Sequence, residues 1–178
     1  MKRERIRDIT FVSLCVAILS VVSQLSIPTG AVPITLQVLS VSMIGYFLGV
    51  KKGLLTIVVY ILIGIVGVPV FSGFQGGIGV VLGYTGGFII GFIPFVLFCG
   101  IKCEHIWARV TLGICGLTIC HLLGIVQYMR LSELDFVSAL LVVSVPYIIK
   151  DVILTILGYM MSAILEKRLY GISVNKKS

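Results

Sequence analysis

The feature that most constrains the fold is a set of three long stretches without Asp, Glu, Lys or Arg, over residues 9–50, 53–101 and 110–129. A helix needs about 20 apolar residues to cross a hydrocarbon core of roughly 30 Å. With 58% hydrophobic and only 12% charged residues, the composition lies far from that of a soluble domain, where about a quarter of the residues are charged. The sequence therefore predicts a single integral-membrane domain over residues 1–178.

Turn residues and short polar segments divide these stretches into membrane spans. The breaks fall at residues 26–30, at Lys51-Lys52-Gly53 and at residues 102–109. The apolar segment 136–145 is too short to cross, so it is predicted to be an interfacial or re-entrant piece that ends at Pro146. The result is an all-α, polytopic fold with six transmembrane helices, predicted over residues 9–25, 31–50, 54–70, 85–101, 110–129 and 147–165.

The basic residues alternate between successive connections. Four lie in the N-terminal arm, two between the second and third spans, two between the fourth and fifth, and four in the C-terminal tail; the intervening connections have none, none and one. Because Lys and Arg are enriched in cytoplasmic loops, both termini are predicted to be cytoplasmic. The net charge of +7 is thus attributed to topology rather than to nucleic-acid binding. No small-residue cleavage site follows Ile18, so the first span is predicted to be retained.

This topology places the glycine-rich stretch 69–91, PVFSGFQGGIGVVLGYTGGFIIG, on the outer side. Glycine permits a close approach of the backbone to a ligand. Irregular backbone is tolerated at membrane depth only where protein buries it or where it lines a cavity. The stretch therefore favours a binding loop, and the alternative is a flexible loop whose glycines serve helix contacts. Within it, Gly83, Gly87 and Gly91 recur at four-residue spacing, which is typical of helix packing.

The same topology brings scattered polar side chains to one depth near the outer surface, among them Thr35, Gln37, Gln75 and Gln127. Lys150 and Asp151 are the sharpest signal, because a charge at the centre of a spanning helix costs about 2.5–3.5 kcal/mol on insertion scales and usually marks function. Adjacent helix residues point about 100° apart, so the two are not expected to stack on one face. They either flank a ligand, or Lys150 reaches toward the surface while Asp151 caps the helix.

The sequence offers little support for a catalytic site or a metal site. The sequence has no GxSxG, HExxH or Walker-type loop. Cys103-Glu104-His105 supplies too few ligands for a zinc site, and His121 is interpreted as a hydrogen-bonded interior histidine. We predict no catalytic residue, no metal and no cofactor. The five cysteines are interpreted as free, buried thiols: Cys15, Cys99, Cys103, Cys115 and Cys120.

Three segments resemble a known family: VPITLQ, the run YILIGIVGVPVFSGFQGGIGVVLGYTGGFIIGF, and PYIIKD. Their order and spacing are similar to those of the BioY family, the biotin-binding S components of energy-coupling factor (ECF) vitamin transporters. The resemblance implies six helices, a biotin pocket near the outer surface and a small-xxx-small motif on the first helix that meets a partner, which Ser13 and Ala17 match. The family pattern reads Gly-Asp with a lysine three residues later, whereas this chain has Lys150-Asp151 and then Leu154.

The resulting hypothesis is an S component that captures biotin from outside, in the plasma membrane of a prokaryote, without a chemical reaction. Its implied partners are a membrane scaffold subunit and two ATP-binding subunits. The alternatives are an S component for a different vitamin and a membrane enzyme acting on lipid. The predicted substrate-binding residues are Thr35, Gln37, Gln75, Gly76, Gly77, Tyr84, Gln127, Lys150 and Asp151.

Overall fold

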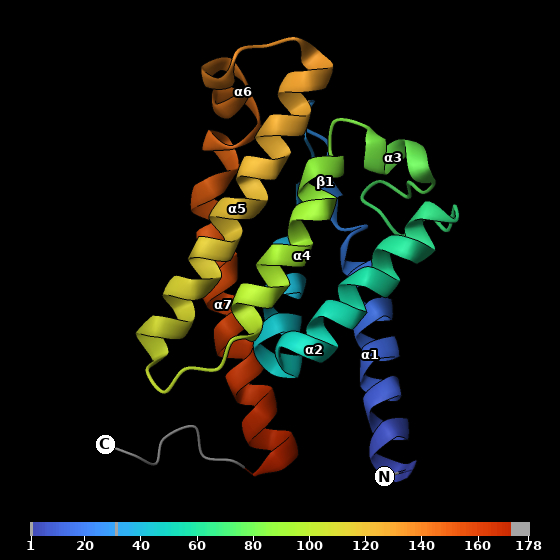
Figure 1. The fold of residues 1–178 in the computed structure, drawn as a ribbon, viewed down its shortest axis with the longest axis vertical. Coiled ribbons are helices and arrows are strands. Elements are labelled where there is room, and N and C mark those ends of the chain that lie inside the picture. The colour runs from blue at the N-terminus through green and yellow to red at the C-terminus, as the bar shows by residue number, and fades with distance from the viewer. Residues whose placement is uncertain (1, 31, 172–178) are drawn as a thin grey trace.

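The fold is almost entirely helical. The structure is a computed structural model that describes residues 2–30 and 32–171. In chain order the elements are α1 (Lys2–Val22), β1 (Ser26–Ile27), β2 (Ile34–Thr35), α2 (Gln37–Ile65), α3 (Ile78–Leu82), α4 (Gly86–Gly100), α5 (Ile106–Ser132), α6 (Phe136–Val143) and α7 (Val145–Tyr170) (Figure 1). The predicted all-α class is confirmed, with one short antiparallel hairpin, β1–β2, as an addition.

The long helices have the length and apolar character that a membrane requires. Among the described residues, three helices suffice to cross a bilayer: α2, α5 and α7. Helix α4 is equally apolar but has 15 residues, and α1 carries charged residues in its first turns. The protein is therefore a membrane protein by length and composition, and the count of six spans stays a prediction.

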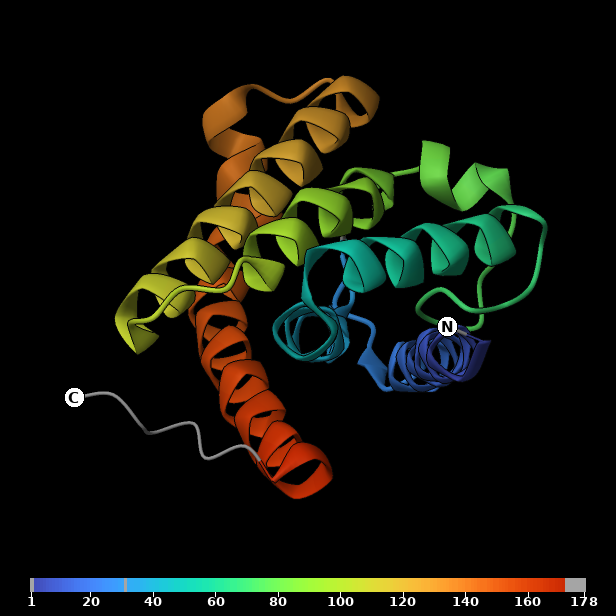
Figure 2. The same ribbon diagram turned by 60° about the horizontal axis from the view of Figure 1, so that its bottom comes forward.

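Helix α2 differs most from the prediction. The sequence suggests two spans separated at residues 51–53, but one helix runs from Gln37 to Ile65 and has its kink at Gly49, with φ 74° and ψ 179°. This backbone conformation is essentially restricted to glycine, whereas lysine is a good helix former and does not interrupt the helix. Figure 2 shows the first arm of α2 end-on and the second arm lengthwise. The predicted second span also begins too early, because residues 34–35 are strand; its first residue, Ala31, lies outside the described residues.

The segment after α5 forms the short helix that its length suggests. Asp135 caps α6: its carboxylate accepts hydrogen bonds from the backbone N–H groups of Val137 and Ser138, at 3.1 and 3.3 Å. Hydrogen bonding from Ser138 lowers the pKa of this exposed carboxyl. The predicted end at Pro146 is wrong, because α6 ends at Val143. Pro146 instead lies in the first turn of α7, where a helix does not need the missing N–H.

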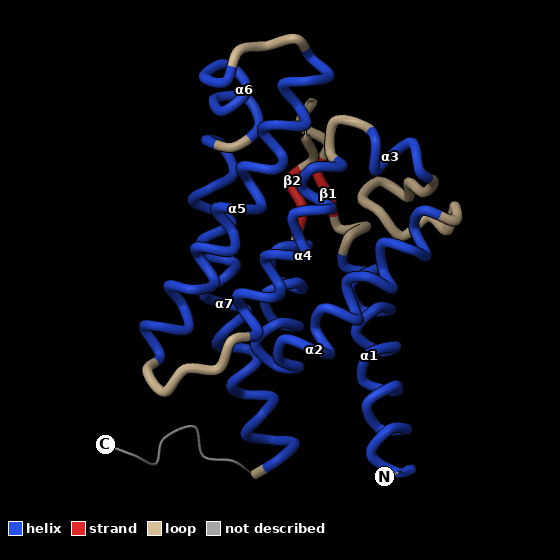
Figure 3. The backbone as a smooth tube through the Cα atoms, in the orientation of Figure 1, coloured by secondary structure: helices blue, strands red, loops and turns tan. Residues whose placement is uncertain are grey.

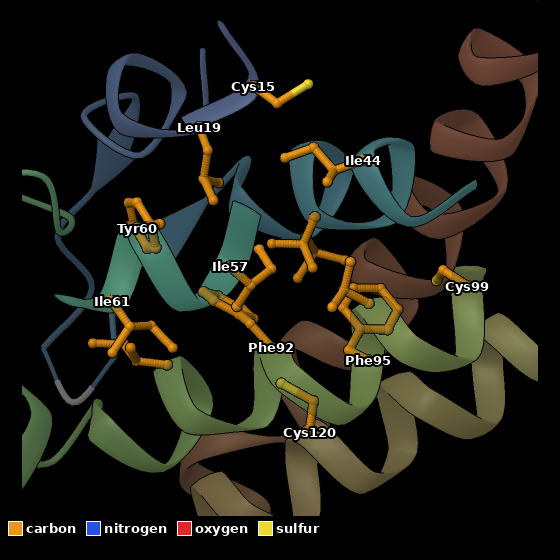
Figure 4. Packing of buried hydrophobic residues seen from close by; sticks show 14 of the residues in the cluster. Cys15, Leu19, Ile44, Ile57, Tyr60, Ile61, Phe92, Phe95, Cys99 and Cys120 are labelled. Atoms are coloured by element: carbon orange, nitrogen blue, oxygen red, sulfur yellow. The ribbon is translucent and has the colours of Figure 1, made fainter. Parts of the chain in front are cut away.

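Glycines bring α4 close to both of its neighbours. A Cβ added at Gly45 of α2 would approach Cys99 Cβ to 2.6 Å, and one added at Gly91 would approach Cys120 of α5 to 2.8 Å. Gly87 likewise faces Leu123 of α5, whereas Gly83 precedes α4, so the predicted glycine stripe is helical only in part. Side chains from α1, α2, α4 and α5 fill the core around α4 (Figure 4).

The two ends of the molecule differ in character. The N-terminal end of α1, the kink in α2, the α4–α5 connection and the C-terminal end of α7 lie at one end (Figure 1). The β1–β2 hairpin, α3 and α6 lie at the opposite end (Figure 3). The basic connections therefore share one end, which agrees with the alternation of charge in the sequence. Which end faces the cytoplasm stays a prediction.

The cysteines are free, but not all of them are buried. Cys15, Cys99 and Cys120 are buried, Cys103 is intermediate and Cys115 is exposed. The prediction of five buried thiols is therefore wrong for two. A thiol behaves as a small apolar group, so lipid can take the place of protein around Cys115.

Candidate functional site

A cavity of about 770 Å³ opens at the hairpin end of the molecule. Its walls come from the β1–β2 hairpin, the start of α2, the loop 71–75, and helices α3, α4, α5 and α7. The volume lies in the range of small-molecule sites, which are mostly apolar with a few placed polar groups. The predicted residues that line it are Thr35, Gln37, Gln75, Tyr84, Lys150 and Asp151.

An ion pair lies in the wall formed by α7. Lys150 Nζ is 2.5 Å from Asp151 Oδ1 and donates a second hydrogen bond, of 3.1 Å, to the carbonyl of Thr35. The side chain of Lys150 is 29% exposed and that of Asp151 is 7% exposed. These neighbours are not expected to share a helix face. Their charged groups nevertheless meet, because the long lysine side chain bends back to the carboxylate.

His121 of α5 holds the other oxygen of the same carboxylate. Its Nε2 is 3.3 Å from Asp151 Oδ2, and its Nδ1 is 2.8 Å from Ser144 Oγ. The ring is buried and packs edge-on against Phe88 at 5.7 Å. The prediction of a hydrogen-bonded interior histidine is confirmed. Sequence reasoning missed that His121 also lines the cavity, because nothing in the sequence pairs α5 with α7.

Thr35 and Gln37 belong to a buried network beside the ion pair. The Thr35 hydroxyl donates to Gln37 Oε1 at 3.3 Å, and Gln37 Nε2 donates to the hydroxyl of Tyr60 at 3.1 Å. Tyr60 in turn donates to the carbonyl of Val70 at 3.0 Å. Burial without such partners would be costly, so the network fixes both polar side chains in the cavity wall and connects the hairpin to the loop that follows α2.

The loop 69–75 forms part of the cavity rim and is fastened to the end of α1. Phe71 and Gln75 pair through their backbones, with N···O distances of 3.0 and 3.3 Å. Between them, Phe74 adopts a left-handed φ of 57°. Its N–H donates to Gln24 Oε1 at 2.8 Å, and the Ser23 hydroxyl donates to the carbonyl of Val70 at 2.5 Å. Gln75 of this loop lines the cavity, and so does the exposed Tyr84, which lies between α3 and α4.

Three predicted site residues do not line the cavity. Gly76 packs against the backbone of residues 67–68. Gly77 donates its N–H to the carbonyl of Gly64 at 2.7 Å and begins α3 with φ 97°. Gln127 donates to the carbonyls of Val81 and Gly83, at 2.9 and 2.6 Å. These residues shape the glycine-rich segment, and a direct contact with ligand stays a prediction for each of them.

Tyr147 is a cavity residue that the sequence analysis overlooked. Its hydroxyl donates to the carbonyl of Val32 at 2.6 Å and lies 3.0 Å from the hydroxyl of Thr29. It thus ties the hairpin to α7. The sequence does hold a signal for this residue. Tyr147 lies in PYIIKD four residues before Asp151, and therefore on the same helix face.

A second hollow, of about 670 Å³, lies between α1 and the second arm of α2. Ser13 and Ala17 line it, and both are exposed. At its charged end Lys52 forms an ion pair of 2.5 Å with Asp8. The small residues on α1 therefore face outward, away from the core.

No group of three His, Cys, Asp or Glu side chains that could hold a metal ion occurs within residues 2–30 and 32–171. The polar groups of the first cavity instead provide one cation, one anion and several hydrogen-bonding groups in an otherwise apolar space. Such an arrangement suits the binding of a small molecule that has an apolar body and polar ends.

Comparison with solved structures defines the class of the fold. The crystal structure of the S-component for biotin from an ECF-type ABC transporter superposes with a TM-score of 0.85, covering 97% of this chain and 95% of that chain at 21% identity. The fold is thus that of an S component, a membrane protein. The model of the BioY family matches residues 1–170. The chain belongs to the BioY family.

Named relatives agree with this family. The chain is 37% identical to the probable biotin transporter BioY of Pyrococcus horikoshii, over 83% of this chain and 88% of the relative. It is 36% identical to the biotin transporter BioY of Thermotoga maritima, over 85% and 90%. It is 32% identical to BioY2 of Lactococcus lactis, over 89% and 91%. The resemblance seen in the sequence is confirmed.

Proposed function

We propose that this protein binds biotin and serves as the substrate-specific subunit of an ECF transporter for biotin uptake. Membership of the BioY family and relatives named as biotin transporters support the substrate. The observation that carries the proposal is the cavity at the hairpin end, which holds the Lys150–Asp151 pair in an apolar space of suitable volume.

Biotin offers complementary chemistry at its two ends. Its carboxylate is a partner for Lys150, and the two N–H groups of its ureido ring are donors for the carboxylate of Asp151. The ureido oxygen is an acceptor for the side-chain amide of Gln75, whereas the N–H of Gly77 is already donated to the carbonyl of Gly64. The apolar body lies between these ends. Hydrogen bonds to charged groups contribute about 1.5–3 kcal/mol each. Because the two ends of biotin are far apart, Lys150 has to turn away from Asp151 to reach the carboxylate.

Transport requires partners that supply energy. The sequence has no nucleotide-binding loop, and the S-component fold is that of one subunit of an ABC-type transporter. We assign the scaffold contact to the outward face of α1 at Ser13 and Ala17, since small residues let helices approach closely in lipid. Two ATP-binding subunits complete the assembly. The membrane is the plasma membrane of a prokaryote, with the cavity on the outer side and both termini in the cytoplasm.

Equilibrium binding to the purified protein tests the substrate. We expect saturable binding of radiolabelled biotin and a raised unfolding temperature, because ligand at 100 times its Kd adds about 2.7 kcal/mol to the stability of the folded state. Other vitamins, offered at the same concentration, are the control. Saturable binding of another vitamin without binding of biotin would contradict the proposal and select a different S component.

A further inference from the structure

The carboxylate of Asp151 is held from two sides by different kinds of group. Lys150 Nζ lies at Oδ1 and His121 Nε2 lies at Oδ2, at 2.5 and 3.3 Å. Lys150 and His121 come from different helices, α7 and α5. Among the described residues that line the cavity, Lys150 and Asp151 are the two with a fixed charge, and His121 is the one histidine, a side chain that donates from both ring nitrogens when it is a cation.

The two partners of Asp151 differ in freedom to move. The lysine side chain is 29% exposed and flexible, whereas the histidine side chain is 4% exposed. Ser144 holds the histidine ring at Nδ1, and Phe88 packs against the ring in a T-shaped arrangement. A ligand in the cavity can therefore reach Lys150, while His121 stays where it is.

An anionic ligand upsets the charge balance of this cluster. If its carboxylate pairs with Lys150, Asp151 loses its cationic partner although it remains buried. Removal of the cation from a buried ion pair is strongly destabilising because the remaining charge is uncompensated, and the neutral ureido N–H groups do not cancel that charge. The site of His121 accommodates a second ring proton without rearrangement, because the hydroxyl of Ser144 either donates to Nδ1 or accepts from it. His121 can then donate from both nitrogens and carry the compensating charge.

We propose that His121 is a positioning residue that holds and neutralises Asp151 when an anionic ligand draws Lys150 away. This inference rests on the proposed function, because it requires a ligand with a carboxylate. His121 acts through Asp151 and has no assigned contact with the ligand. It therefore sets the preference of the cavity for anionic over neutral ligands of the same shape.

The test compares biotin with biotin amide, which keeps the shape but lacks the negative charge. His121→Gln retains an N–H donor toward Asp151 but cannot become cationic. We expect this variant to bind biotin about tenfold more weakly and biotin amide within about twofold of the unchanged protein. The matched control is His105→Gln, since His105 is the second of the two histidines and is exposed at the start of α5. It should alter neither affinity.

A second background separates charge compensation from packing. In Lys150→Met no lysine can be drawn away, so the added His121→Gln change should affect biotin and its amide equally. The inference would be overturned if His121→Gln alone lowered the affinities for biotin and biotin amide equally. It would also be overturned if a loss of affinity selective for biotin persisted in the Lys150→Met background.

A milder variant guards against misfolding. Ser144→Ala removes the hydrogen bond that orients the ring, and we expect a smaller loss that is again selective for biotin; loss of both ligands together would contradict us. If the unchanged protein binds no biotin at all, the proposed function itself fails. If it binds biotin but His121→Gln shows no selectivity, only this inference fails.

Discussion

At the scale of single residues, the buried carboxylate of Asp151 organises the cavity. The residue is 5% exposed as a whole, and its two carboxylate oxygens contact groups from α7 and α5. An acid in a membrane-spanning helix is costly, and here hydrogen-bonded partners offset that cost. In the proposed function the same carboxylate receives the ureido N–H groups of biotin.

We predict that Asp151→Asn weakens biotin binding by about 1.5–3 kcal/mol, or one to two decades in Kd, because an acceptor oxygen is replaced by a donor. Equilibrium binding to the purified variant measures the loss. Asp8→Asn is the matched control, since Asp8 pairs with Lys52 outside the cavity and should leave the affinity unchanged. An unaltered Kd for Asp151→Asn would remove the carboxylate from the binding site.

The sequence predicted this part of the site unevenly. Lys150 and Asp151 stand out because they are charges within an apolar helix, and that signal needs no tertiary structure. The ion pair with His121 depends on the approach of α5 to α7, which no local pattern records. Gln127 has the polarity of a ligand-binding residue, yet its amide donates to backbone carbonyls at the end of α3. Polarity and depth in the membrane thus identify candidate residues, but they do not distinguish a residue that lines the cavity from one that holds the backbone around it.

At the scale of elements, the kink of α2 has a specific cause. Gly45, Gly49 and Gly53 recur at equal spacing, so the pattern does not reveal which of them breaks the helix. The structure selects Gly49, whose neighbour Val50 approaches Gly100 so closely that an added Cβ there would lie 2.6 Å from the Val50 nitrogen. The packing of α4 against the corner therefore decides the position of the kink, and the two lysines that follow continue the helix.

We predict that Gly49→Ala destabilises the protein by about 1–3 kcal/mol, because its backbone conformation is strained for any residue with a Cβ. The nearest atom to the added Cβ is 3.8 Å away, so the loss measures backbone strain rather than a clash. Gly79→Ala is the control, as nothing lies within 4 Å of its added Cβ. Unfolding of the detergent-solubilised variants gives the difference, and equal stabilities would contradict the assignment.

The outward face of α1 provides a prediction about assembly. Replacing both Ser13 and Ala17 by Leu adds bulk where the scaffold helix is expected to approach, so co-purification with the scaffold subunit should be lost. Biotin binding should persist, because these residues lie in a separate hollow. Thr118→Leu, on an exposed position of α5, is the control. Intact assembly with failed binding would assign α1 to the cavity instead.

At the scale of the whole molecule, the arrangement of the two ends leads to a test of topology. Gln75→Cys and Lys51→Cys, each in a background without the five native cysteines, should react with a membrane-impermeant reagent from opposite sides of the membrane. Lys51 is chosen because it is exposed, whereas Lys52 is paired with Asp8. Retained biotin binding by the cysteine-free protein, before Gln75 is replaced, verifies the background. Reaction of both cysteines from the outside would overturn the six-span topology.

The anchoring of the cavity mouth has a mechanical consequence. On one side of the mouth, the loop 69–75 is hydrogen-bonded to the side chains of Ser23 and Gln24 at the end of α1. On the other side, the β1–β2 hairpin accepts hydrogen bonds from the side chains of Tyr147 and Lys150 of α7. Both sides of the mouth are therefore tied to α1, because the hairpin begins four residues after α1 ends, and the hairpin is tied to α7 as well. A displacement of α1 would therefore move residues 69–75 through the side chains of Ser23 and Gln24, and it would move the hairpin through the chain that joins the two.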